Sequence, residues 1–82
     1  MDREAFNAAF GNFIREGREN KGMLQSDVSL HLGVSIAYYS YLELGKRNID
    51  LKMALDICSF LGLNMNEFVA FYKRKTRNKK QW

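Results

Sequence analysis

The sequence contains no proline and only six glycines among its 82 residues. Strands joined by tight hairpins usually depend on Gly and Pro, so this scarcity favours helices joined by short turns in a single domain. The single cysteine excludes an intramolecular disulfide and fits a reducing cytoplasm. No apolar run is long enough to span a bilayer, and the acids at Asp2 and Glu4 do not fit an export signal. We therefore expect a cytoplasmic, largely helical protein without a membrane segment.

Acidic residues are absent from the last ten positions, which hold six of the thirteen Lys and Arg residues. Residues 1–72 then carry seven bases against nine acids, a net charge of −2, whereas the whole chain has a net charge of +4. This distribution predicts one domain over residues 1–74 and a basic C-terminal tail over residues 75–82. Such a tail can neutralise DNA phosphates. The alternative is a solvated chain end that contacts nothing.

Most catalytic and metal-binding groups are also scarce. His31 and Cys58 are the only histidine and cysteine, so one chain cannot assemble a metal-ligand set or a Cys/His dyad. Gly11 and Gly17 lie six residues apart inside a helical pattern and do not form a phosphate-binding loop. The sequence therefore predicts no enzyme, no metal and no cofactor, and it gives no sign of a small-molecule ligand.

Five helical segments can be recognised, and no strand pattern competes with them, which predicts an all-α fold. The expected helices span about residues 2–20, 25–32, 36–44, 51–61 and 65–74, the last of them extending to residue 74 or beyond. Residues suited to N-caps precede four of them: Asp2, Ser35, Asp50 and Asn64, the last in a capping box with Glu67. Leu24 cannot cap the second helix, where Asp27 is expected to compensate through the helix dipole.

Residues 25–44 form the most informative unit. Two short helices are joined by Gly33-Val34-Ser35, and a glycine with positive φ lets the chain reverse within three residues. This is the helix-turn-helix arrangement, with Val34 filling the angle between the helices and the small Ser29 allowing them to approach. Apolar spacing predicts one core that consists of Phe10, Phe13, Ile14, Val28, Leu32, Val34, Tyr39, Leu42, Leu51, Ala54, Cys58, Leu61 and Phe68.

A set of residues between Phe13 and Val69 links the chain to a known family. These residues are Arg18, Gly22, Gln25, Val28, Leu32-Gly33-Val34-Ser35, Leu42-Glu43, Gly45-Lys46-Arg47-Asn48, Leu51, Leu61-Gly62-Leu63 and Phe68. In them the sequence resembles the Cro/C1-type (Xre family) helix-turn-helix regulators, which include phage repressors and the controller proteins of restriction-modification systems. The resemblance implies a five-helix bundle of the lambda-repressor-like type. It also implies a transcriptional regulator, such as a repressor, that binds double-stranded DNA as a homodimer on a palindromic operator.

The same resemblance implies which residues contact the DNA backbone. Gln25, at the start of the second helix, would donate hydrogen bonds to a phosphate, which suits the free N–H groups of a helix N-terminus. Lys46, Arg47 and Asn48 would lie against the backbone of the same half-site. The alternative for Gln25 is an exposed polar residue without a ligand, and for Lys46 and Arg47 it is ordinary surface charge.

The helix over about residues 36–44 would lie in the major groove, with its N-terminal residues over the base edges. By resemblance the residues at this surface are Ser35, Ile36, Ala37, Tyr38, Ser40 and Tyr41. Ile36 and Ala37 could contact only the thymine methyl group, so specificity would rest largely on DNA shape and on water. The alternative is that this apolar helix docks onto protein, as in an antitoxin-like or scaffold module on the same fold.

A further expectation concerns an ion pair between two helices. In the resembling proteins the arginine of the first helix bridges to the glutamate that closes the recognition helix, so the resemblance implies a structural salt bridge between Arg18 and Glu43. The alternative is two unrelated surface charges.

The sequence also predicts a dimer interface. Phe60, Phe71 and Tyr72 are apolar residues left over after the core is filled, and exposed apolar surface of this kind usually marks an interface. The alternative is that Phe71 folds back onto the same core.

Overall fold

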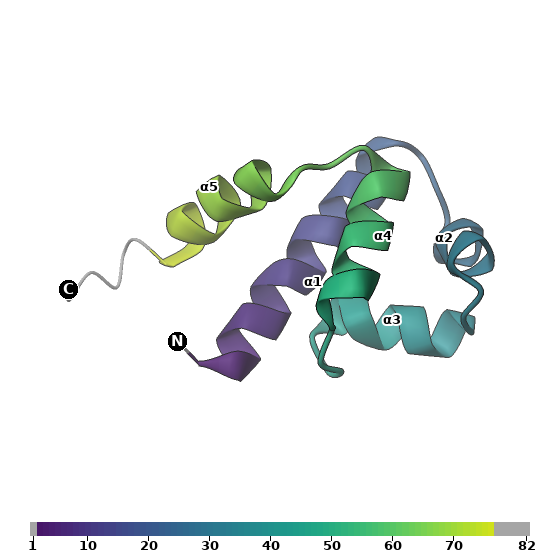
Figure 1. Ribbon diagram of the computed structural model, residues 1–82, viewed down its shortest axis with the longest axis horizontal. Helices are drawn as coiled ribbons and strands as arrows, with labels where there is room; N and C mark the ends of the chain where they lie inside the picture. The colour runs from purple at the N-terminus through teal and green to yellow at the C-terminus, as the bar shows by residue number, and fades with distance from the viewer. Residues whose placement is uncertain (1, 77–82) are drawn as a thin grey trace.

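The computed structural model describes residues 2–76, and it forms five helices there without a strand (Figure 1). The helices are α1 (Arg3–Asn20), α2 (Gln25–Leu32), α3 (Ile36–Leu44), α4 (Leu51–Leu61) and α5 (Met65–Thr76). The predicted all-α, five-helix fold is confirmed, and α5 runs to Thr76, in agreement with an expected end at residue 74 or beyond. Within this part of the chain no helix is long and apolar enough to cross a membrane.

Capping side chains account for most helix starts. Asn64 and Glu67 form the predicted capping box, in which each side chain accepts a hydrogen bond from the backbone N–H of the other, at 2.9 and 3.0 Å. Leu24, which has no side-chain oxygen, precedes α2. There the Asp27 carboxylate accepts a hydrogen bond from the Leu24 N–H at 2.8 Å. A direct hydrogen bond therefore compensates for the missing cap, in addition to the dipole effect expected from the sequence.

The central element is α1, which packs against α3, α4 and α5. In Figure 1, α1 and α4 lie next to each other in the middle of the molecule, and α2 and α5 lie at opposite ends of the long axis. Since α3 packs against α1, and α2 packs against α3 and α4, both helices of the helix-turn-helix unit are attached to the rest of the domain.

The buried core follows the predicted apolar pattern closely. It consists of Ala9, Phe10, Phe13, Ile14, Val28, Tyr39, Leu42, Ala54, Ile57, Cys58, Leu61, Phe68 and Phe71. Leu32 and Val34, two predicted core residues, are half-buried at its edge. The expectation for Leu51 is wrong, because its side chain is 71% exposed. Leu51 begins α4 at the edge of the buried stripe, where few side chains of other helices cover it.

Two glycines of α1 allow other parts of the chain to come unusually close. A methyl group at Gly11 would lie 2.6 Å from the carbonyl oxygen of Leu42 and would overlap the carbonyl oxygen of Glu43. A methyl group at Gly17 would lie 2.7 Å from a methyl carbon of Leu63. The backbone at the end of α3 therefore rests directly on the α1 backbone, and this contact fixes the position of α3.

Candidate nucleic-acid interface

The turn between α2 and α3 has the geometry that the sequence predicts. Gly33 ends α2 with a φ of 74°, and the N–H of Val34 donates to the carbonyl oxygen of Ser29 at 3.0 Å. Ser29 is 3% exposed, so its small side chain lies between the two helices. Ser35 caps α3, because its hydroxyl oxygen accepts a hydrogen bond from the N–H of Tyr38 at 3.0 Å. The chain thus reverses within three residues and presents α3 at a fixed angle to α2.

The predicted ion pair between Arg18 and Glu43 is present and buried. Nε of Arg18 donates to Oε2 of Glu43 at 2.6 Å, and Nη2 donates to Oε1 at 3.0 Å. Nη1 of Arg18 donates in addition to the carbonyl oxygen of Met23, which precedes α2, at 2.8 Å. Arg18 is 9% exposed and Glu43 is 4% exposed. One paired charge cluster therefore joins α1, the chain before α2, and the end of α3.

The surroundings of Glu43 keep its carboxylate ionised. Burial alone would raise the pKa of Glu43, but hydrogen bonds from Arg18 and Gln25 and the neighbouring Tyr39 hydroxyl outweigh it, so the pKa lies below its usual value. The buried Tyr39 hydroxyl faces this carboxylate without meeting the geometry of a hydrogen bond. Burial and the Glu43 charge raise the pKa of Tyr39, so that its hydroxyl stays protonated.

Gln25, which the resemblance assigned to a DNA phosphate, already has one partner inside the protein. Its Nε2 donates to Oε1 of Glu43 at 2.9 Å. The amide nitrogen carries two N–H groups, so one of them is left for a ligand. The contact also holds the start of α2 against the end of α3, directly before Lys46.

The outward face of α3 is largely apolar, as the sequence indicated. Ile36 is 51% exposed, Tyr41 is 45% exposed and Leu44 is 60% exposed, while Ala37 is also exposed. Ser40 is half-buried among them. Four of the residues expected at this surface therefore face solvent in whole or in part: Ile36, Ala37, Ser40 and Tyr41. The hydroxyl of Ser35, also expected there, is used as a helix cap.

Tyr38 lies at the edge of this face. Its ring is half-buried and packs against the core, and the guanidinium carbon of Arg47 lies 5.1 Å from the ring centroid. Arg47 thus folds back from the chain after α3 onto the N-terminal half of that helix. The resemblance placed Tyr38 on the groove-reading surface of the helix and Arg47 against the DNA backbone, whereas the structure joins the two side chains in one contact.

A polar residue that sequence reasoning missed holds the segment after α3. Asn7 of α1 is 7% exposed, and its Nδ2 donates to Oδ1 of Asn48 at 2.9 Å. A signal was available in the sequence, because Asn7 lies three residues before Phe10 in the apolar stripe of α1. A polar side chain at such a position usually has a specific partner. Asn48, Arg47 and Lys46 are all exposed, and Asn48 is tied to α1.

The residues predicted for a dimer interface are only partly available. Phe71 is 4% exposed and its ring centroid lies 5.5 Å from that of Phe13, so the expectation that it is left over after core packing is wrong. The α5 helix turns this side of its surface towards α1. Phe60 is half-buried and stacks on His31 with ring centroids 3.9 Å apart, and Tyr72 is also half-buried against the core. Exposed apolar surface occurs instead at Leu51 and at Leu55, which is 49% exposed.

The basic tail falls largely beyond the part of the chain that the structure describes. Arg77, Lys79 and Lys80 lie outside the described residues, and the side chain of Lys75 is not described. Lys73 and Arg74 belong to α5, at the end of the molecule opposite α2 (Figure 1).

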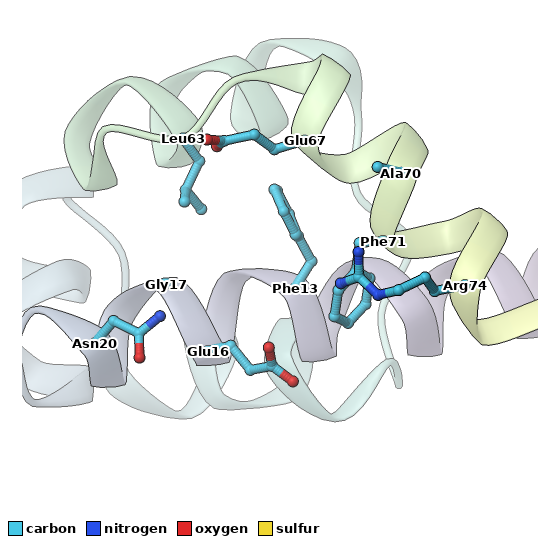
Figure 2. A pocket seen from close by; sticks show the side chains of 9 residues that line it. All are labelled: Phe13, Glu16, Gly17, Asn20, Leu63, Glu67, Ala70, Phe71 and Arg74. Atoms are coloured by element: carbon cyan, nitrogen blue, oxygen red, sulfur yellow. The ribbon is translucent and has the colours of Figure 1, made fainter.

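A groove between α1 and α5 is lined by charged residues of both signs (Figure 2). Phe13, Leu63 and Phe71 form its apolar floor, and Glu16 and Glu67 stand at its rim. Its two carboxylates outnumber its one basic residue, Arg74, so the groove disfavours a phosphate group. Among residues 2–76, no cluster of three or more His, Cys, Asp or Glu side chains could hold a metal ion.

Comparison with known proteins agrees with this geometry. A family model described as helix-turn-helix matches residues 14–68, which is more than half of the chain and includes α2, α3 and both residues of the Arg18–Glu43 pair. A search of curated proteins finds no match. The chain belongs to the Cro/C1-type helix-turn-helix family of DNA-binding proteins.

Proposed function

We propose that the protein is a transcriptional regulator that binds a palindromic operator as a homodimer, with α3 in the major groove. The observation that carries this proposal is the arrangement of hydrogen-bonding and basic groups around α3. The side chain of Gln25 donates to Glu43 near the end of α3, and Lys46 follows Glu43 by three residues. The guanidinium of Arg47 lies over the ring of Tyr38 in the N-terminal half of α3. These groups flank the outward face of α3 in the way that backbone contacts flank a groove-reading helix.

Salt dependence tests the backbone contacts. Each lost phosphate contact should lower the slope of log K against log salt by about 0.9. We expect Lys46→Ala to lower the slope by about that amount per chain, because its exposed charge lies next to α3. Tyr41→Ala should change the preferred DNA sequence and leave the slope unchanged, because Tyr41 is neutral. Arg3→Ala, at the start of α1, is the control for loss of an exposed charge outside the helix-turn-helix unit. Equal slopes for Lys46→Ala and Arg3→Ala would contradict the assignment of Lys46.

The tail is part of the same proposal. Removing residues 75–82 deletes four bases, and a tail that contacts phosphate only part of the time should lower the salt slope by about 1 per chain. Sequence preference should not change, because the tail has no evident means of reading bases. If the truncated chain keeps the full slope and affinity, the tail does not contact DNA.

A homodimer is supported by apolar surface on α4. Leu51 and Leu55 lie one helical turn apart and are 71% and 49% exposed. If the dimer binds two adjacent major-groove half-sites in the ordinary way, its two copies of α3 lie about 34–36 Å apart, which is one turn of DNA. Tyr72, half-buried on α5, stays a candidate for the dimer interface, whereas Phe60 lies on the opposite side of α4 from Leu51 and Leu55, where its ring stacks on His31.

The α4 surface can be tested with one exposed residue. We expect Leu55→Glu to convert the dimer to a monomer at tens of micromolar protein, because the change places a charge in an apolar contact. The substitution should not disturb the core of the monomer, because Leu55 is 49% exposed, so the thermal midpoint of the Leu55→Glu monomer should not fall for that reason. Leu30→Glu, at a position that is 83% exposed on α2, should leave the sedimentation coefficient unchanged. A wild-type chain that sediments only as a monomer would exclude the dimer.

A second candidate function is a protein-interaction module on the same fold. The apolar exposure of Ile36 and Leu44 on the outward face of α3 favours it. A mobility-shift titration on the DNA upstream of the protein's own gene, together with a selection from random duplexes, separates the two functions. Selection of a palindromic duplex supports the regulator, whereas binding to no duplex at low salt supports the interaction module.

A further inference from the structure

The contact between Tyr38 and Arg47 has the geometry of a cation held on an aromatic face. The guanidinium carbon of Arg47 lies 5.1 Å from the Tyr38 ring centroid, within the distance of about 6 Å at which such contacts are attractive. Tyr38 itself cannot move freely, because its ring packs against the core and its backbone N–H is bound to the Ser35 cap. The ring is therefore a fixed platform for the flexible arginine side chain.

The segment around Arg47 is held at both of its ends. Gly45 ends α3 with a φ of 75°, and the N–H of Lys46 donates to the carbonyl oxygen of Tyr41 at 2.9 Å. On the other side, the buried Asn7 donates to Oδ1 of Asn48 at 2.9 Å. Between these two hydrogen bonds, the side chain of Arg47 is held by its contact with the Tyr38 ring of α3. We refer to residues 45–48 as the clamp loop.

The charge of the clamp loop is not neutralised within the protein. Within the described residues, neither Lys46 nor Arg47 forms an ion pair, whereas Arg15, Arg18 and Lys52 each pair with a carboxylate. Arg47 is held instead by a neutral ring, which fixes its position and leaves its charge and its N–H groups for a ligand. A group held in this way is suited to an anion such as a DNA phosphate.

We propose that Tyr38 is a positioning residue, which holds the guanidinium of Arg47 where it meets a DNA phosphate, and not a base-reading residue. This inference rests on the proposed DNA-binding function. The ring face does the positioning, so the Tyr38 hydroxyl is dispensable. Loss of the ring releases Arg47 into many rotamers, and binding then has to immobilise it again.

Three variants of the full-length chain test this role: Tyr38→Phe, Tyr38→Leu and Arg47→Ala. The probes are a duplex selected by the wild-type chain from a random pool and a mixed-sequence duplex of the same length. We expect Tyr38→Phe to bind both duplexes like the wild type. Tyr38→Leu should bind both about 2- to 5-fold more weakly per chain, and Arg47→Ala should lower the salt slope by about 0.9 per chain.

The salt slope separates positioning from base reading. Tyr38 is neutral, so loss of a base contact would leave the slope unchanged, whereas displacement of Arg47 should lower it towards that of Arg47→Ala. In the Arg47→Ala background, Tyr38→Leu should have no further effect on the slope. The inference is wrong if Tyr38→Phe binds as weakly as Tyr38→Leu, or if Tyr38→Leu keeps the wild-type slope.

A measurement without DNA distinguishes failure of this inference from misfolding of a variant and from failure of the proposed function. The side-chain protons of Arg47 should be shifted upfield by the Tyr38 ring in NMR spectra of the wild type and Tyr38→Phe, and this shift should be lost in Tyr38→Leu. Circular dichroism must show the same helical content in all variants at the binding temperature. An absent shift in the wild type overturns the platform even if the chain binds DNA. A wild-type chain that shows the shift but binds neither duplex overturns the proposed function, and with it the role of Tyr38 in DNA binding.

Discussion

Replacing Arg18 by alanine should lower the free energy of unfolding by about 3–5 kcal/mol. The change leaves the carboxylate of Glu43 at 4% exposure without its bidentate partner, and an unpaired buried charge is far more costly than a lost surface contact. Because one kcal/mol shifts the midpoint of a small domain by about 4–8 °C, the thermal midpoint should fall by at least about 12 °C. Arg3→Ala, an exposed arginine on the same helix, is the control and should shift it little. Equal midpoints for the two variants would contradict this prediction.

A double substitution separates the cost of an unpaired charge from the value of the pair itself. Arg18→Met with Glu43→Leu removes both charges and keeps apolar volume, so it should recover much of the stability that Arg18→Ala loses. The same variant gives a pH control. Glu43 has a lowered pKa in the folded state, so its contribution to stability is complete above the usual Glu pKa of about 4.3 and is lost as pH falls through the folded value. Acid unfolding should therefore be less steep in the double variant than in the wild type.

Gly11→Ala should destabilise the protein by about 1–3 kcal/mol, although alanine is the better helix former by about 1 kcal/mol. The new methyl group would meet the carbonyl oxygens of Leu42 and Glu43, which belong to the α3 backbone and cannot turn aside. The helices would have to separate at the point where α1 supports α3. Urea unfolding followed by circular dichroism measures the loss.

Gly17→Ala is a matched control on the same helix. Its methyl group would meet only the end of the Leu63 side chain, which can change rotamer. The helix-propensity gain then offsets most of the crowding, and the net change should stay within about 1 kcal/mol. If Gly11→Ala is as stable as Gly17→Ala, the backbone contact between α1 and α3 is not as close as described.

The helix boundaries were predictable because each is determined by a few adjacent residues. Ser35 caps α3, Asn64 and Glu67 form the capping box of α5, and Gly33 takes the left-handed conformation that the turn requires. The Arg18–Glu43 pair was predictable for another reason, since it came from the family resemblance and not from periodicity. Local rules and the resemblance therefore account for the fold and for the buried ion pair.

The errors and omissions concern contacts between helices distant in sequence. Phe71 was assigned to a dimer surface because the spacing of residues in α5 does not reveal which side of the helix turns towards α1. Neither could sequence alone show that Arg47 folds back onto Tyr38 or that Asn7 reaches Asn48. Leu51 illustrates a different error, because an apolar residue at helical spacing was assigned to the core, whereas the buried residues of α4 begin about one turn later, at Ala54.

The anchoring of α3 by one side of the helix has a consequence for how the proposed reading of DNA sequence can change. Tyr39, Leu42 and Glu43 hold the helix from the inner side, and Ser35 fixes its start. The outward positions 37, 41 and 44 are exposed and take no part in that anchoring. The residues at these outward positions can therefore be replaced, by mutation or by transfer from a relative, without altering the contacts that hold α3 in place. If α3 reads DNA as we propose, the preferred DNA sequence and the stability of the domain depend on different faces of a single nine-residue helix.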